Sequence, residues 1–258
     1  MIKLIATDLD GTLLRRDKTI SPYTLQVLQQ CRARGIKLVF ATARPRRVTV
    51  GYCAQIPVDA LALHNGAVVY AGEKLLAHHG IDAKERILQA IARDHPQAKL
   101  CVEIDDAHYA NFDVTAVWDN VTAVASDFTN LPAMPADKII VLLDQAQDLN
   151  RYAQYVPDDC YIQLCEGAFG LIMHRSATKH NAVQALAAHF GISPAEIAAF
   201  GDDHNDIGML RFAGTGVAMA NAIDEVKAAA DFICGTNDED GVARWLENAL
   251  QSDEPIVS

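Results

Sequence analysis

Residues 2–13 of the chain read IKLIATDLDGTL. A short apolar run that ends in polar residues is typical of a strand buried on both faces of a parallel sheet. Asp8 and Asp10 follow this run directly, so we expect both carboxylates at the carboxyl end of the strand, where open α/β sheets bind ligands. Alternation places the two side chains on the same side of the segment. Because like charges at close range are costly, the stretch also predicts a cation or a shared proton beside them.

The alternation of strands and helices continues outward from this stretch. Ser21-Pro22 is typical of a helix start and Gly35 of a helix end, and a second buried strand is expected at residues 36–41. Strand, helix and strand in this order form the unit of a doubly wound α/β sheet. The alternation resumes after Thr178, so we expect an α/β fold with a doubly wound, mainly parallel, Rossmann-like core.

The pattern changes in the middle of the chain. Between residues 81 and 176, several strand-like segments accompany two expected helices, one of them around 148–155, which indicates an α+β unit with a largely antiparallel sheet. The predicted domains are a core in two parts, residues 1–80 and 177–258, and an inserted α+β domain at 81–176. A parallel crossover needs only about a dozen residues. The insertion is far longer, so it can act as a lid over a site.

Composition narrows the functional classes. The 258 residues are 50% hydrophobic and 21% charged, as in a globular protein, and 33 acidic against 22 basic residues leave a net charge of -11. Binding of nucleic acid or anionic membranes depends on Lys and Arg, so neither partner is expected. Asp8 breaks the N-terminal apolar run too early for a secretion signal, and no later run is long enough to span a bilayer. We therefore expect a cytoplasmic protein.

A second acidic stretch, GDDHND at residues 201–206, follows another expected strand at 197–200. If this strand lies beside the first, up to five carboxylates converge on one rim of the sheet, and such oxygen ligands favour Mg²⁺ over zinc. Thr42 ends a strand with a hydroxyl donor, and Lys179 precedes a helix whose N-terminal amides attract anions, as a phosphoryl group requires. The five acidic residues are Asp8, Asp10, Asp202, Asp203 and Asp206.

Four stretches occur in a fixed order: DLDGTL at 8–13, TAR at 42–44, Lys179, and GDDHND at 201–206. In this order they resemble the four motifs of the haloacid dehalogenase-like (HAD) hydrolases. The resemblance covers the whole chain. In its details the chain resembles the Cof-type branch, which carries a type IIB cap. It implies a HAD core with the α+β insertion as its cap. The segments that point to this branch are NGA at 65–67, GVAMANA at 216–222 and DEDGVA at 238–243.

The resemblance implies a Mg²⁺-dependent phosphatase that hydrolyses a small phosphorylated metabolite, with a sugar phosphate as the expected substrate. Asp8 would be the nucleophile that forms an aspartyl-phosphate. Asp10 would protonate the leaving oxygen and then activate the hydrolytic water. Thr42 and Lys179 would hold the transferring oxygens. These four residues are the predicted catalytic set.

The same resemblance implies the remaining members of the site. Mg²⁺ would be held by Asp8, the backbone carbonyl of Asp10, and Asp202. Asp203 and Asp206 would orient the lysine or metal-bound water. Ala43 stands where the family commonly has glycine, which bears on the contacts of that loop. The predicted substrate-binding residues are Thr42, Ala43, Arg44, Lys179 and Asn205.

Two alternatives remain open at this point. One is a hexose phosphomutase of the same superfamily, which would transfer the phosphoryl group between two sugar hydroxyls in preference to water. The other is a noncatalytic, phosphometabolite-binding regulatory protein. Loss of Asp8, Asp10 or Lys179 would have favoured this second alternative, and none of them is lost. The sequence is compatible with a monomer or a homodimer.

Overall fold

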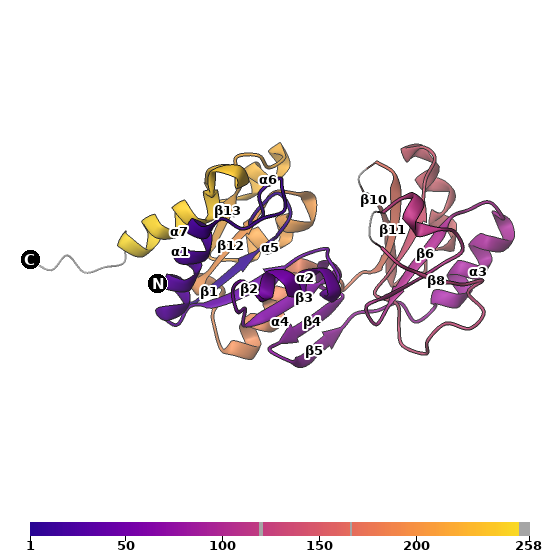
Figure 1. Ribbon diagram of the computed structural model, residues 1–258, viewed down its shortest axis with the longest axis horizontal. Helices are drawn as coiled ribbons and strands as arrows, with labels where there is room; N and C mark the ends of the chain where they lie inside the picture. Colours follow the sequence, from indigo (N-terminus) through magenta and orange to yellow (C-terminus); the bar gives the residue numbers. More distant parts are fainter. Residues whose placement is uncertain (119–120, 166, 253–258) are drawn as a thin grey trace, which may run out of the picture. The chain divides into compact units, whose positions relative to one another are not determined.

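The computed structural model describes residues 1–118, 121–165 and 167–252. The chain divides into two compact units (Figure 1). The core unit combines Met1–Ala77 with Thr178–Ser258, and the inserted unit comprises His78–Ala177. The chain thus leaves the core unit and later returns to it, so two distant parts of the sequence build one hydrophobic core.

The core unit is built on a sheet with strands from both parts of the sequence. In the order in which they lie in the sheet, they are β14 (Phe232–Ile233), β13 (Thr215–Ala218), β12 (Ile197–Gly201), β1 (Leu4–Thr7), β2 (Lys37–Ala41), β3 (Ala60–Leu63), β4 (Val68–Ala71) and β5 (Lys74–His78). Pairing is parallel from β14 to β3, and β4 joins β3 in antiparallel fashion. Every residue of β1 is buried, as its apolar sequence requires. The predicted α/β class with a mainly parallel core is confirmed.

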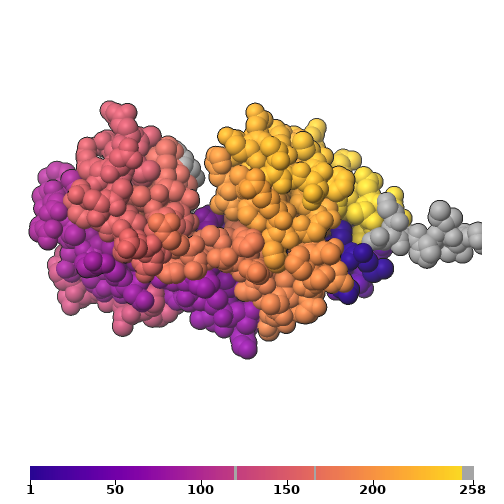
Figure 2. Space-filling model, turned by 180° about the vertical axis from the view of Figure 1, so that it is seen from behind, coloured from indigo at the N-terminus to yellow at the C-terminus, as the bar shows by residue number. Residues whose placement is uncertain are grey.

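Helices of the core unit begin and end where the local sequence supplies caps. The Ser21 side chain caps α1 (Pro22–Ala33), and the Thr178 side chain caps α4 (Lys179–Phe190), which Gly191 ends in the left-handed conformation. In Figure 2 the indigo N-terminal region borders the yellow C-terminal helix, which packs against α1. None of the helices in the described ranges is long and apolar enough to cross a membrane. The other helices are α2 (Arg46–Cys53), α5 (Ile207–Phe212), α6 (Asp224–Ala229) and α7 (Gly241–Ser252).

The inserted unit is built on a second sheet. Its strands, in spatial order, are β10 (Cys160–Cys165), β11 (Phe169–His174), β9 (Lys138–Leu142), β6 (Leu100–Ile104), β7 (Ala107–Ala110) and β8 (Val124–Ala125). Neighbouring strands are antiparallel, except that β7 and β8 run parallel. The helix α3 (Lys84–Asp94) packs on this sheet through Ile87, Leu88 and Ile91. A smaller apolar cluster contains Trp118 and Phe169.

One expected helix of the inserted unit takes another form. Instead of an α-helix around residues 148–155, the structure has two 3-10 segments, η3 (Ala146–Arg151) and η4 (Ala153–Tyr155). No residue within these two segments is buried. Tyr152, which lies between the two segments, is buried in the core of the inserted unit. Most helical stability comes from packing of an apolar face, and one buried side chain is too little to extend this stretch into a full α-helix.

Candidate active site

The carboxyl ends of β1, β12 and β2 bring predicted site residues to one edge of the core sheet. β1 and β12 are parallel neighbours with Thr7 opposite Phe200, so Asp8 and Asp202 follow adjacent strands close to their ends. Thr42 follows β2, which flanks β1 on its other side. This edge is where open α/β sheets bind ligands. The two acidic stretches therefore meet through tertiary structure.

Lys179 lies among the carboxylates of this edge. Its Nζ is 2.9 Å from Oδ1 of Asp8 and 2.6 Å from Oδ1 of Asp206. The side chain of Lys179 is 1% exposed, and that of Asp206 is 0% exposed. The second oxygen of Asp206 accepts hydrogen bonds from the backbone N–H groups of Asp202 and Asp203, at 3.0 and 3.1 Å. Asp206 is thus held at both oxygens and anchors the ammonium group beside Asp8.

Burial changes the acid–base properties of these groups. Burial raises the pKa of Asp8 to about 7. The positive charge of Lys179 acts to lower this pKa, whereas the negative charges of Asp206 and Asp202 raise it further. Burial likewise raises the pKa of Asp202 to about 6, although a hydrogen bond from Thr12 lowers it. Desolvation acts to lower the pKa of Lys179, but Asp206 and Asp8 outweigh it and hold that pKa above its ordinary value. One ammonium faces three carboxylates, so the site favours a further cation.

Oxygen ligands for such a cation lie close together. Carboxylate oxygens of Asp8, Asp202 and Asp206 lie within 4.8 Å of one another. Because both oxygens of Asp206 are already engaged, Asp8 and Asp202 are the better placed ligands. At Gly11, with φ of +73°, a Cβ would lie 2.2 Å from an Asp202 carboxylate oxygen, so the loop after β1 closes tightly on Asp202. This all-oxygen set fits a hard divalent cation.

Asp10 has different partners from Asp8. Its Oδ2 is 2.5 Å from Nε of Arg44, and its Oδ1 is 2.7 Å from both Nη2 of Arg44 and Nζ of Lys18. Burial acts to raise the pKa of Asp10, but the hydrogen bonds from Arg44 and Lys18 outweigh it and lower that pKa to about 2. Arg44 therefore faces a carboxylate of its own chain, and Asp10 is ionised in this arrangement.

The other predicted residues take different positions. Thr42 is buried, and its hydroxyl oxygen accepts a hydrogen bond from the backbone N–H of Arg44 at 3.2 Å, whereas Ala43 between them is exposed. Asn205 is partly buried in the turn after β12. Asp203 is exposed, and its carboxylate accepts a hydrogen bond from the backbone N–H of His204 at 2.7 Å. Of the two acidic residues expected to orient the lysine, Asp206 is the one bonded to it.

Two asparagines that were given no role from the sequence brace the loop after β1. Asn221 donates from Nδ2 to the carbonyl oxygen of Gly11 at 2.7 Å, and its Oδ1 accepts from the backbone N–H of Asn237 at 3.0 Å. Asn237 in turn donates from Nδ2 to the carbonyl oxygen of Leu14 at 2.8 Å. Asn221 belongs to the GVAMANA segment at 216–222, which resembles the Cof-type branch, and this resemblance could have indicated a role for Asn221. Thr12 lies within the DLDGTL stretch at 8–13, which was a signal of the same kind, whereas Lys18 lies outside the family-like stretches.

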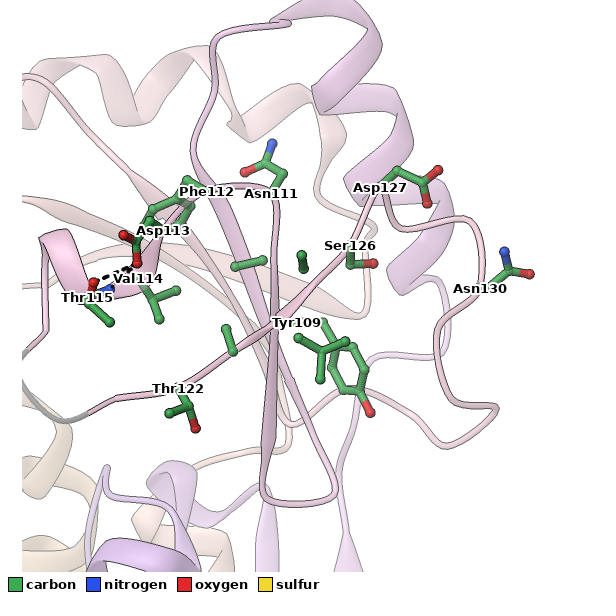
Figure 3. Close-up of a pocket in the computed structure, with 14 residues that line it drawn as sticks. Tyr109, Asn111, Phe112, Asp113, Val114, Thr115, Thr122, Ser126, Asp127 and Asn130 are labelled. Atoms are coloured by element: carbon green, nitrogen blue, oxygen red, sulfur yellow. Dashed lines mark hydrogen bonds between the residues drawn. The ribbon is translucent and has the colours of Figure 1, made fainter.

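The inserted unit has a hollow of about 1100 Å³ beside β7 and β8 (Figure 3). The described residues that line it include no Lys, Arg or His. Its two carboxylates, Asp113 and Asp127, each accept hydrogen bonds from a threonine two residues later, as drawn for Asp113 and Thr115 in Figure 3. Without a cation, this hollow is poorly suited to hold a phosphoryl group, so the edge of the core sheet remains the candidate site.

Comparison with known proteins shows the family of the chain. The family model described as haloacid dehalogenase-like hydrolase matches residues 5–246. The 5-amino-6-(5-phospho-D-ribitylamino)uracil phosphatase YitU of Bacillus subtilis (strain 168) is 30% identical over 260 residues, which cover 95% of this chain and 96% of that protein.

Solved structures extend the likeness to the fold. A haloacid dehalogenase-like hydrolase from Bacteroides thetaiotaomicron superposes with a TM-score of 0.86 at 25% identity, over 96% of this chain and 100% of that one. The HAD subclass IIB sugar phosphatase BT4131 superposes with a TM-score of 0.83 at 26% identity, over 96% and 98% of the two chains. The match covers both the core unit and the inserted unit. The chain therefore belongs to the haloacid dehalogenase-like hydrolases, in their Cof-type branch.

Proposed function

We propose that the protein is a Mg²⁺-dependent phosphatase that hydrolyses a small phosphorylated metabolite through an aspartyl-phosphate. The observation that carries this proposal is the buried Asp8–Lys179–Asp206 cluster at the carboxyl end of β1, beside Asp202. A carboxylate nucleophile for phosphorus must be accessible yet surrounded by positive charge, because the phosphate it attacks is an anion. The ammonium group of Lys179 supplies part of this positive charge, and a divalent cation held by Asp8 and Asp202 would supply the rest.

In the first half of the reaction, Asp8 attacks phosphorus, the new bond from its oxygen forms, and the bond from phosphorus to the ester oxygen breaks. Lys179 and the hydroxyl of Thr42 stabilise the charge on the transferring oxygens. Asp206 contributes indirectly, since it fixes the position of the ammonium group and favours its charged form. The product of this half-reaction is the aspartyl-phosphate and an alkoxide that requires a proton.

Asp10 supplies that proton and later takes one from the water that hydrolyses the aspartyl-phosphate. In the present arrangement Asp10 is ionised and bonded to Arg44 and Lys18, which keeps its pKa at about 2. It must therefore give up these bonds before it can carry a proton. We propose that Arg44, which is thereby released, can then contact the substrate.

Mg²⁺ is proposed to be held by Asp8, the backbone carbonyl of Asp10, and Asp202. When bound, the ion neutralises charge between the carboxylates and the phosphoryl group. The raised pKa values of Asp8 and Asp202 support this assignment, because they reflect buried negative charge that lacks full compensation. Asp203, exposed and bonded to its own turn, is proposed to remain outside the metal ligands.

A sugar phosphate, or a phosphate ester of a sugar-like polyol, is the proposed substrate class. Two of the similar proteins support it: one is named a sugar phosphatase and the other a phosphatase of a phosphoribityl compound. We further propose that the inserted unit, predicted at residues 81–176, is the cap domain that selects the leaving group, as the likeness to a subclass IIB phosphatase suggests.

The test is release of inorganic phosphate from p-nitrophenyl phosphate by metal-free protein, with and without added Mg²⁺. Mg²⁺-dependent release is the expected result. Folded protein that releases no phosphate under either condition, or equal amounts under both, would contradict the proposal. A panel of sugar phosphates, nucleotides and pyridoxal phosphate then tests the substrate class, and a sugar isomer produced in place of free phosphate would indicate a mutase.

A further inference from the structure

The turn that follows β3 has an unusual backbone. His64, Asn65 and Gly66 have successive φ values of 49°, 57° and 95°. His64 and Asn65 are 2% and 4% exposed, so this is no solvent-facing hairpin tip. Left-handed conformations are uncommon for residues other than glycine, and they persist only where the surrounding structure holds them. Two such residues in a row, both buried, indicate that this turn is held in place for a reason.

The backbone of the turn is bonded to the segment that contains Thr42. The N–H of Asn65 donates to the carbonyl oxygen of Thr42 at 2.9 Å, and the N–H of His64 donates to the carbonyl oxygen of Arg44 at 3.2 Å. The left-handed conformation of His64 sets the direction of the Asn65 N–H that follows it. The turn therefore sets the position of the loop after β2.

The same turn contacts the start of α4. A Cβ on Gly66 would lie 2.3 Å from the carbonyl oxygen of Thr178 and 3.1 Å from Cβ of Ala182. Thr178 is the N-cap residue directly before Lys179. A side chain at position 66 would thus displace the residue that begins the lysine-bearing helix.

The side chain of Asn65 reaches a third segment. Its Oδ1 accepts a hydrogen bond from Nδ2 of Asn205 at 2.9 Å. A carboxamide has a donor end and an acceptor end, and its partners decide which way it is turned. The Oδ1 of Asn205 is buried without a hydrogen-bond partner among the described residues. The bond to Asn65 is therefore what directs the nitrogen end of Asn205, and its second N–H group is left for another acceptor.

We infer that Asn65 is a positioning residue for phosphate binding, which engages one N–H group of the Asn205 carboxamide and leaves the second N–H group available to a phosphoryl oxygen. The inference rests on the proposed function, in which Thr42, Lys179 and Asn205 contact the transferring phosphoryl group. The turn that contains Asn65 contacts all three segments that carry these residues. An Asn205 amide turned the other way would present an oxygen to the anion and repel it.

The test compares Asn65→Gly, Asn205→Ala and the double variant with the wild type. Glycine keeps the left-handed backbone and removes the carboxamide, so its effect reports the side chain alone. We expect Asn65→Gly to raise KM for p-nitrophenyl phosphate and the inhibition constant of inorganic phosphate by about tenfold, with a smaller change in kcat. The double variant should be no worse than Asn205→Ala, because Asn65 acts through Asn205.

Asp105→Gly serves as the matched control, since Asp105 is exposed and has φ of 49° in the inserted unit. It should leave phosphate affinity unchanged. Fully additive effects of the two asparagine variants, or unchanged phosphate affinity in Asn65→Gly, would overturn the inference. If the wild type binds inorganic phosphate but does not hydrolyse phosphate esters, the proposed function fails. The inference about Asn65 can then still be tested, because the dissociation constants of inorganic phosphate for the wild type, the two single variants and the double variant can be compared in the same way. A wild type that neither hydrolyses nor binds phosphate overturns both.

Discussion

The core unit and the inserted unit each bury a cluster of charged side chains, and the clusters differ in their place on the sheet. In the inserted unit, Glu103 of β6 lies in register with His108 of β7 and Lys138 of β9. Its Oε1 is 3.1 Å from Nε2 of His108 and 3.0 Å from Nζ of Lys138. These are cross-strand neighbours in the middle of a sheet, where paired charges stabilise the register.

The cluster of the core unit lies beyond the ends of its strands and contains more carboxylates than cations. Asp8, Asp202 and Asp206 share the single ammonium of Lys179, and the pKa of Asp8 rises to about 7. Charges within a sheet can be balanced by the strand next to them. Strand ends instead gather groups from loops, where an unbalanced arrangement can be retained for a ligand. Both clusters are buried, so burial alone does not distinguish them. The excess of carboxylates over cations is what marks the cluster of the core unit as the candidate site.

The sharpest test of this contrast is Asp8→Asn. The amide keeps the shape of the side chain but cannot form the aspartyl-phosphate, so we expect turnover to fall by at least about 10⁴-fold. Circular dichroism and the midpoint of urea unfolding should show that the fold is retained. Substantial remaining turnover would mean that another group is the nucleophile.

The next largest effect is expected for Lys179→Met. The substitution removes the cation that faces Asp8 and Asp206, both buried, and leaves them to repel each other. Loss of one partner of a buried ion pair typically costs about 3–5 kcal/mol. Urea unfolding should show a loss of this size in the free energy of unfolding, together with loss of phosphatase activity. A variant as stable as the wild type would contradict the assigned burial of this pair.

Lys138→Met is the matched variant in the inserted unit, and a smaller effect is expected. Lys138 is 13% exposed, and Glu103 keeps His108 as a neighbour after the substitution. We expect the free energy of unfolding to fall by about 1–2 kcal/mol, with kcat for p-nitrophenyl phosphate within about twofold of the wild type. A hundredfold loss of kcat would show that this cluster also takes part in the reaction.

The smallest effect is expected for an exposed pair. Lys3 and Glu196 lie 2.6 Å apart at the surface. Hydrogen bonds from Lys3 and from the backbone N–H of Ser193 lower the pKa of Glu196 from 4.5 to about 2. A lowered pKa means that Glu196 stabilises the folded state above its ordinary pKa and ceases to do so as the pH falls from about 4.5 to about 2.

Glu196→Gln should therefore flatten the fall of the unfolding temperature over this acid range. Salt should weaken the effect in the wild type, because exposed charges are screened. Thermal unfolding between pH 2 and 7, at low and high salt, checks the prediction. An equally steep fall in the variant would show that this pair does not contribute.

Much of the core could be predicted because its signals are local. The apolar run before Asp8 has the pattern of a buried strand, and Ser21 and Thr178 are capping residues at helix starts. The helix expected around residues 148–155 was wrong, because Tyr152 is the one buried residue of this described stretch and a single buried side chain does not give an α-helix an apolar face. Local patterns therefore served best where they coincided with burial.

The sequence by itself determined the order of strands and helices in the core and the presence of two acidic stretches after apolar strands. Tertiary structure alone decided that β12 lies beside β1, that Asp206 and not Asp203 bonds to Lys179, and that Asp10 faces Arg44. Lys179 and Asp206 are 27 residues apart in the sequence, and Asp10 and Arg44 are 34 residues apart. The strands β1 and β12 are separated by much more of the chain. Capping and periodicity act within a few residues, whereas the choice of a charge partner depends on which loops the completed sheet brings together.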